Sequence, residues 1–92
     1  NSYSISLITK GECSLVIKGK SYSVGKGVVC IINPYELHEI RSSSWEHINL
    51  VLSAYFVRLI LKDHKNSRIR FQNIIKNEKL SLDLQTLYSQ KE

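Results

Sequence analysis

The sequence predicts a mainly β domain, a small barrel of short strands, that ends in one or two helices. Residues 3–9 alternate polar and apolar side chains and are rich in β-forming types, which is the pattern of a half-buried strand. Residues 28–32 are apolar without interruption and are followed by Asn33 and Pro34, which is typical of a buried strand with a defined end. Short strands with regular turns between them favour a barrel or sandwich.

Three short strands are expected before Gly25, over residues 3–9, 13–18 and 21–24. Turns around Gly11 and Gly19 would connect them as two successive hairpins. The buried strand over residues 28–32 follows, and Pro34 ends it.

The chain beyond Pro34 is expected to continue as strand, turn and strand before it becomes helical. The two strands would cover residues 37–41 and 45–52, with a turn over residues 42–44. Ser53 is a suitable N-cap for a short helix, because apolar residues follow it with a helical period: Tyr55, Phe56, Leu59 and Ile60. Ile69 and Phe71 on alternate positions predict one more strand, which would close the barrel.

A second helix is expected to begin near Asn77 and to run toward Lys91. Its apolar residues recur at i, i+4, i+7 and i+8 and form one stripe: Leu80, Leu84, Leu87 and Tyr88. The chain is therefore divided into a β domain over residues 1–75 and a helix over residues 76–92. The helix could cover the barrel, link it to a further domain, or pair with its copy in a second subunit.

The composition limits the class of protein. With 92 residues and 42% hydrophobic content, the chain suits a single core. No apolar run approaches the roughly 20 residues that span a bilayer, and no secretory leader follows Asn1, so we expect a cytoplasmic protein with no membrane partner. Cys13 and Cys30 lie in apolar runs without a paired spacing, which favours free buried thiols over a disulfide or zinc ligands.

The net charge of +5 raises the question of nucleic-acid binding. Four lysines fall at expected hairpin ends, where charge protects exposed strand edges: Lys10, Lys18, Lys20 and Lys26. A denser basic group could contact DNA or an acidic partner, or could be a solvated loop: Lys62, His64, Lys65, Arg68 and Arg70. We favour solvated surface for both groups.

The segment GKGVVCIINPYELHEI, residues 25–40, resembles the second signature motif of the cupin superfamily as it occurs in AraC-type transcription regulators. It contains a glycine turn at Gly27, a buried strand, a proline turn at Pro34 and, four residues later, His38. The segments ISLITKGECSLVIKGKSYSV and SSSWEHINLVLS resemble the neighbouring strands of the same sensors. Together the matches cover residues 3–52.

This resemblance implies the N-terminal domain of an AraC-type regulator, with a partial cupin-like double-stranded β-helix (jelly-roll barrel) as its fold. Such a domain binds a small-molecule effector, a sugar or another small metabolite, forms a homodimer and controls a helix-turn-helix domain. No helix-turn-helix pattern is present in this sequence. Contact with DNA is therefore expected only through a domain absent from this chain.

The positions that match the effector pocket of sugar-sensing relatives are His38, Ile40, His47 and Asn49. Strand alternation supports this grouping, because His38 and Ile40 share one face of a strand, as do His47 and Asn49. Ser4 and Trp45 complete the candidate ligand-binding set, although a packing role is open for Trp45. Ile40 and Asn49 stand where aromatic rings stack on sugar in the arabinose sensor. This departure favours an effector smaller or more apolar than a sugar, or none.

Metal-dependent cupins carry a His-x-His and a glutamate before the first glycine turn, with the later histidine as fourth ligand. Here Ser4 stands in the place of the glutamate, and the two histidines would precede Asn1. His38 alone cannot hold zinc or iron, which need three or four ligands, and its ring could equally be bonded to backbone. We therefore predict no metal, no cofactor and no enzymatic activity.

Two alternatives remain open. The chain could be a small metal-free cupin enzyme, an isomerase or lyase, with His38 and His47 as acid and base. It could also be a dimerisation module without an effector, in which the leucine stripe of the last helix is the functional surface.

Overall fold

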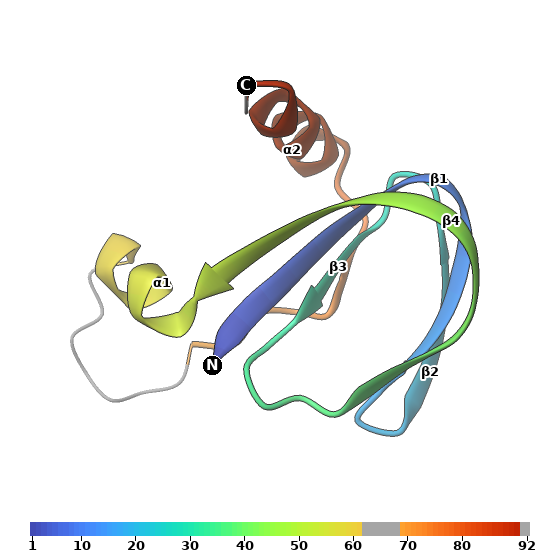
Figure 1. Cartoon of the computed structure of the whole chain (residues 1–92), viewed down its shortest axis with the longest axis horizontal. Helices are drawn as coiled ribbons and strands as arrows, with labels where there is room; N and C mark the ends of the chain where they lie inside the picture. Colours follow the sequence, from blue (N-terminus) through green and yellow to red (C-terminus); the bar gives the residue numbers. More distant parts are fainter. Residues whose placement is uncertain (62–68, 91–92) are drawn as a thin grey trace.

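The computed structural model describes residues 1–61 and 69–90, and it is mainly β as predicted. In chain order the elements are β1 (Ser2–Ile17), β2 (Lys20–Gly25), β3 (Val29–Ile32), β4 (His38–Ser53), α1 (Ala54–Ile60), β5 (Ile74–Ile75) and α2 (Glu78–Ser89) (Figure 1). No helix within the described ranges is long and apolar enough to cross a membrane. Most of the denser basic group lies outside these ranges: Lys62, His64, Lys65 and Arg68.

The strands form one antiparallel sheet around β1. One edge of β1 pairs with β4 over almost its whole length, and the other edge is shared by β2 and β3. β5 pairs with the outer edge of β3. β1 and β4 bend together, so the sheet curls into an open arch, a half barrel (Figure 1).

The expected closure of the barrel is wrong. Among the described residues β4 pairs only with β1, so the sheet stays open at that edge. Ile69 and Phe71 are not in a strand, and β5 begins later and has two residues. The reason lies in the bonding of Phe71, whose backbone N–H and carbonyl are taken by the Asn33 side chain at 2.8 and 2.9 Å instead of by a strand backbone.

The expected turns at Gly11 and over residues 42–44 are also wrong, because β1 and β4 run through both positions. Gly11 has a φ of 80°, and a Cβ added there would lie 1.8 Å from the carbonyl oxygen of Ser44. The glycine therefore allows two strand backbones to approach closely where the arch bends. It does not reverse the chain.

Two bulges accompany this bend. The pairing of β1 with β4 skips Thr9 on β1, between Ile8 and Lys10, and it skips Arg41 on β4. One extra residue shifts the alternation of the strand, so that the inward positions of β1 change from even to odd numbers after Thr9. Both shifts tighten the curl of the sheet.

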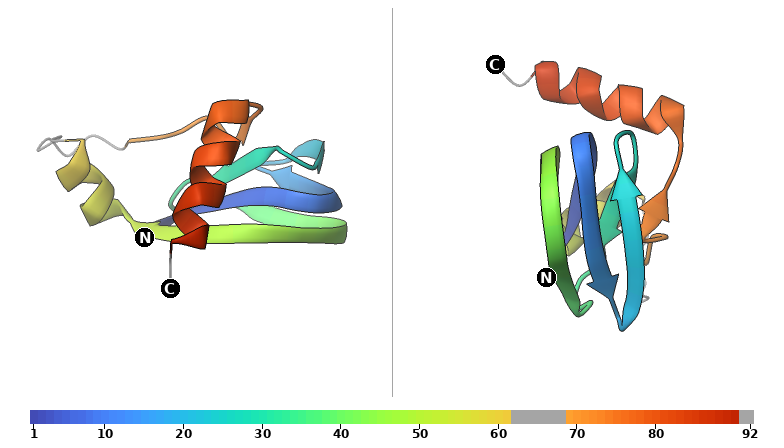
Figure 2. Two further views of the ribbon diagram at one scale, coloured as in Figure 1. Left: turned by 90° about the horizontal axis from the view of Figure 1, so that it is seen from above. Right: turned by 90° about the vertical axis from the view of Figure 1, so that its right-hand side faces the viewer.

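Apolar side chains form a cluster on each face of the sheet. The inner cluster lies within the arch and consists of Ile8, Cys13, Leu15, Ile17, Val24, Val28 and Cys30. The outer cluster consists of Leu7, Val29 and Ile31, and Leu80 and Leu84 of α2 pack against it. α2 thus lies across the outside of the sheet (Figure 2). The predicted burial of both cysteines is confirmed.

Both predicted helices are confirmed, together with the predicted N-cap at Ser53, and Asn77 caps the second helix. The Ser53 side chain accepts a hydrogen bond from the Phe56 backbone N–H at 3.0 Å, and Asn77 accepts from Leu80 at 2.9 Å. The proline turn after β3 is confirmed as well, with Tyr35 at a φ of 65°. This turn brings the chain from the middle of the sheet to the start of β4.

Candidate functional site

The predicted ligand-binding residues of β4 lie on the inner face of the sheet. Directly opposite residues of an antiparallel pair project to the same side. The register places His38, Ile40 and His47 opposite three members of the inner cluster, Ile17, Leu15 and Ile8. The predicted alternation is therefore correct for these three positions.

Trp45, Asn49 and Ser4 share that inner face. Trp45 packs against the inner cluster. Asn49 lies two residues beyond His47 and opposite Ser6, and Ser6 follows Ser4 by two residues on β1. All six predicted residues therefore face the inside of the arch.

Contacts join four of these six residues near the middle and end of β4. The rings of Trp45 and His47 are stacked, with centroids 4.1 Å apart and planes 12° apart. Trp45 is half-buried and His47 is exposed, so the pair extends the apolar surface of the inner cluster toward solvent. A flat or apolar group of a small molecule can stack or pack there.

A polar patch adjoins this stack. The Asn49 side-chain amide donates to the hydroxyl of Ser4 at 3.0 Å and to that of Ser6 at 2.8 Å. It also lies 3.4 Å from the Ile5 carbonyl oxygen. Ser6 was not predicted, although its position two residues after Ser4 on a strand is the pattern that would have indicated it.

His38 and Ile40 lie at the other end of β4. His47 follows His38 by nine positions, which is about 30 Å of extended strand. The His38 ring is exposed, and its Nδ1 lies 3.3 Å from the Glu36 carbonyl oxygen. This contact agrees with a histidine bonded to backbone. Ile40 is half exposed, at 51%.

Glu36 is a buried carboxylate that sequence analysis missed. Burial opposes its ionisation, but hydrogen bonds from Asn33 and Asn73 and the charge of Arg70 outweigh burial and lower the pKa of this carboxyl. A single glutamate in a turn gives no sequence signal for such a site. The hydrogen-bond partners of Glu36 lie up to 37 positions away from it in the sequence.

Residues 1–61 and 69–90 offer no group of three His, Cys, Asp or Glu side chains that could hold a metal ion. Burial raises the pKa of the Cys30 thiol to about 11, and neighbouring Cys13 adds to the shift. Burial also raises the pKa of Cys13. Both thiols are therefore protonated at neutral pH and poor as nucleophiles.

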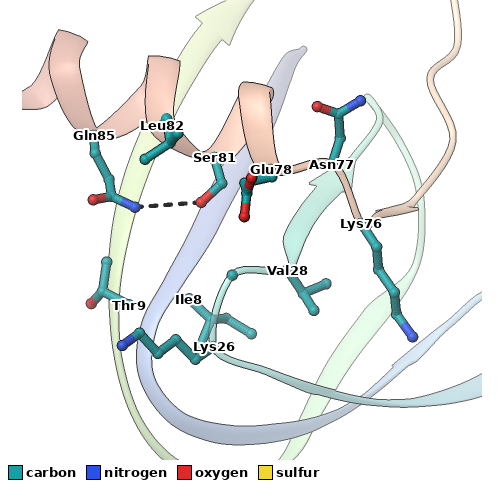
Figure 3. Close-up of a pocket in the computed structure, with 11 residues that line it drawn as sticks. Ile8, Thr9, Lys26, Val28, Lys76, Asn77, Glu78, Ser81, Leu82 and Gln85 are labelled. Carbon is teal, nitrogen blue, oxygen red and sulfur yellow. Dashed lines mark hydrogen bonds between the residues drawn. The ribbon is translucent and has the colours of Figure 1, made fainter.

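A further hollow of about 730 Å³ lies between α2 and the turn that joins β2 to β3 (Figure 3). Ile8 and Val28 supply apolar surface, while Lys26, Glu78 and Ser81 are among its polar residues. None of the six predicted ligand-binding residues lines it. The hollow exists only because α2 docks on the sheet, so the sequence gives no pattern for it.

The predicted dimerisation stripe is divided between two environments. Leu80 and Leu84 are half-buried against the outer cluster. Leu87 and Tyr88, nearer the end of α2, are 56% and 52% exposed. The helix thus covers the sheet with one part of the stripe and presents the other part outward.

An open, curled antiparallel sheet with an aromatic and polar inner face and a helix outside is a partial cupin-like β domain. The sequence model of the AraC-like ligand binding domain matches residues 1–91, so the chain belongs to that family. It is a ligand-sensing regulatory domain, and the predicted AraC-type sensing domain is confirmed. The family is regulatory rather than catalytic and binds small-molecule effectors. No curated protein and no solved structure matches the chain.

Proposed function

We propose that this chain senses an effector for an AraC-family bacterial transcription regulator in the cytoplasm. The effector binds on the inner face of the arch, and the change passes through α2 to a helix-turn-helix domain that contacts DNA. Residues 1–75 form the sensor, and residues 76–92 form the connection. The observation that carries the proposal is the presence of all six predicted residues on one open face.

The chemistry of this face indicates the kind of effector. The stacked rings of Trp45 and His47 suit a flat or apolar group. Asn49 with its two serine partners suits one or two hydrogen-bonding groups beside it. The proposed effector is therefore a small metabolite with one apolar or flat side and few polar groups.

The test is a titration of Trp45 fluorescence with a panel of small metabolites, because Trp45 is the one tryptophan in the chain. We expect a saturable change for at least one compound. Asn49→Ala should weaken its binding by about tenfold, since a lost hydrogen bond in a binding site costs on the order of 1 kcal/mol or more.

The matched control is Glu46→Gln. Glu46 lies between Trp45 and His47 on β4 and projects to the other side of the sheet, so its variant should bind like the wild type. A compound whose affinity is unaffected by Asn49→Ala, or falls equally in both variants, would place binding away from the inner face. A flat response to every compound would count against an effector.

We also propose that the regulator is a homodimer held by the outward part of the α2 stripe. Leu87 is exposed at the position where two copies of α2 would meet, next to Tyr88. Leu80 and Leu84 would support the contact by holding α2 on the sheet. The family's regulatory role favours sensing and dimerisation over the metal-free isomerase or lyase considered from the sequence.

A further inference from the structure

The Glu36 carboxylate contacts residues from three parts of the chain: the end of β1, the turn after β3 and the segment before β5. Its side chain is only 3% exposed. One oxygen, Oε1, accepts hydrogen bonds from the backbone N–H and side-chain amide of Asn33, at 2.8 and 3.0 Å, and from the Asn73 amide at 2.8 Å. The other, Oε2, accepts from Arg70 at 2.9 Å and lies 3.7 Å from Lys18 Nζ. We call these five residues the Glu36 cluster.

The Glu36 cluster fixes the segment that carries α2. Asn33 binds both backbone groups of Phe71, and the Asn73 amide donates to the Ile31 carbonyl oxygen at 2.9 Å. The Ile31 N–H donates in turn to the Asn73 carbonyl oxygen at 2.7 Å. Residues 70–73 lead directly into β5 and α2. The exit of this segment from the sheet is therefore set by bonds to Glu36 and Asn33.

The same turn borders the inner face. Glu36 precedes His38 by two residues, and its carbonyl oxygen lies 3.3 Å from His38 Nδ1. The Leu37 carbonyl oxygen accepts from the Lys18 N–H at 2.9 Å, which ties the turn to the end of β1. A molecule that shifts the start of β4 would move the main chain of Glu36 as well.

We propose that Glu36 couples the His38 end of the inner face to the position of α2. Glu36 touches His38 through its main chain, and it holds Arg70 and Asn73 through its carboxylate. Movement of the turn changes these bonds and thereby the position in which α2 packs against the outer cluster. This coupling rests on the proposed function, since an effector on the inner face that also reaches the His38 end of β4 would alter what α2 presents. Glu36 is thus a positioning residue.

The first test measures amide hydrogen exchange in the protein without ligand. Glu36→Gln should speed exchange in β5 and α2 by about tenfold, because a buried charged acceptor is lost, while the amides of β1 keep their protection. The matched control is Glu39→Gln. Glu39 pairs with Arg41 at 3.3 Å but is exposed, so its loss should leave α2 unchanged. Equal exchange in the two variants would overturn the proposal.

Two further variants separate coupling from general destabilisation. Arg70→Gln removes a contact on the α2 side of the cluster and should also speed exchange in α2. Lys18→Gln removes a contact on the sheet side and should not. If both variants act alike, or if exchange rises uniformly through β1 and α2, Glu36 has only a general stabilising role. These variants keep the carboxylate and its asparagine donors, so they remain informative if Glu36→Gln does not fold.

The His38 end is tested by a double-mutant cycle. His38→Ala should speed exchange in α2 by about twofold or more in the wild-type background, because a contact worth a few tenths of a kcal/mol or more is removed. It should have no added effect in the Glu36→Gln background. Additive effects would contradict the coupling. The cycle needs no effector, so a failed fluorescence titration and a failed cycle reject different claims.

Discussion

Burial and hydrogen bonding act in opposite directions on the ionisation of Glu36, and hydrogen bonding prevails. The groups that face the carboxylate are the amides of Asn33 and Asn73 and the side chains of Lys18 and Arg70. The pKa of this carboxyl is therefore lower in the folded protein than in the unfolded chain. Its contribution to stability is present above the unfolded value and is lost on acidification.

Glu36→Gln is expected to change the acid limb of the stability curve. The wild type should lose part of its free energy of unfolding as pH falls below about 4.5, the ordinary value, through the lowered folded value. The variant should lose less over this range, although it starts about 1.5 to 3 kcal/mol less stable at neutral pH. Urea unfolding at pH 7 and pH 3 measures both effects. If wild type and variant lose the same free energy of unfolding between pH 7 and pH 3, another carboxyl controls acid unfolding.

At the scale of elements, the two long strands depend on a close approach at Gly11. Two independent features exclude a side chain there, the positive φ and the Ser44 carbonyl oxygen that a Cβ would overlap. Gly27 shares only the first feature, because its φ is 89° and nothing lies within 4 Å of an added Cβ. A comparison of substitutions at the two glycines therefore separates the cost of backbone strain from the cost of steric overlap.

Gly11→Ala is expected to cost about 3 kcal/mol or more of stability, since strain and overlap add and β1 must move away from β4. Gly27→Ala is expected to cost about 1 to 2 kcal/mol, from strain alone. Urea unfolding of both variants gives the comparison. Equal losses would mean that the strands separate there without penalty.

The same elements show what sequence can predict. The apolar run of β3, the proline turn, the N-cap at Ser53 and the start of α2 near Asn77 are local patterns, and each was predicted correctly. Gly11 was misplaced because a glycine that permits a turn and one that permits a close strand contact look alike until the partner strand is known. The prediction of a closing strand was wrong for a similar reason, because nothing in the sequence indicates that the Asn33 side chain binds the backbone of Phe71.

The candidate site was predictable to the extent that alternation along one strand determines it. The register bears out the shared face of His38 and Ile40 and that of His47 and Asn49. Ser6 and Glu36 were missed, because their roles come from pairing with residues distant in sequence. The second hollow was missed because it depends on how α2 docks.

At the scale of the whole molecule, the apolar stripe of α2 has two roles, packing on the sheet and presenting an exposed apolar surface. Leu84 packs toward the sheet, while Leu87 is exposed one turn later. A charge at Leu87 should therefore affect association between subunits without loosening the helix. A charge at Leu84 should loosen the helix first.

Leu87→Glu is expected to convert a dimer into a monomer, with the fold retained, because a charge would be buried at the proposed contact. Light scattering gives the mass, and circular dichroism checks the fold. Thr86→Glu is the control, since Thr86 is exposed beside Leu87 but lies off the apolar stripe. A dimer that persists in Leu87→Glu, or dissociates equally in Thr86→Glu, would move the interface elsewhere.

The extra residue at Thr9 also constrains how this arch can change in evolution. Deleting Thr9 alone would remove the bulge and leave the second half of β1 in phase, because Ile8 and Lys10 already pair with adjacent residues of β4. Losing one residue more would turn Cys13, Leu15 and Ile17 toward solvent. Relatives should therefore tolerate the loss of the single bulge residue, with a less strongly curled sheet, but should carry a compensating insertion before Cys13 when a second residue is lost.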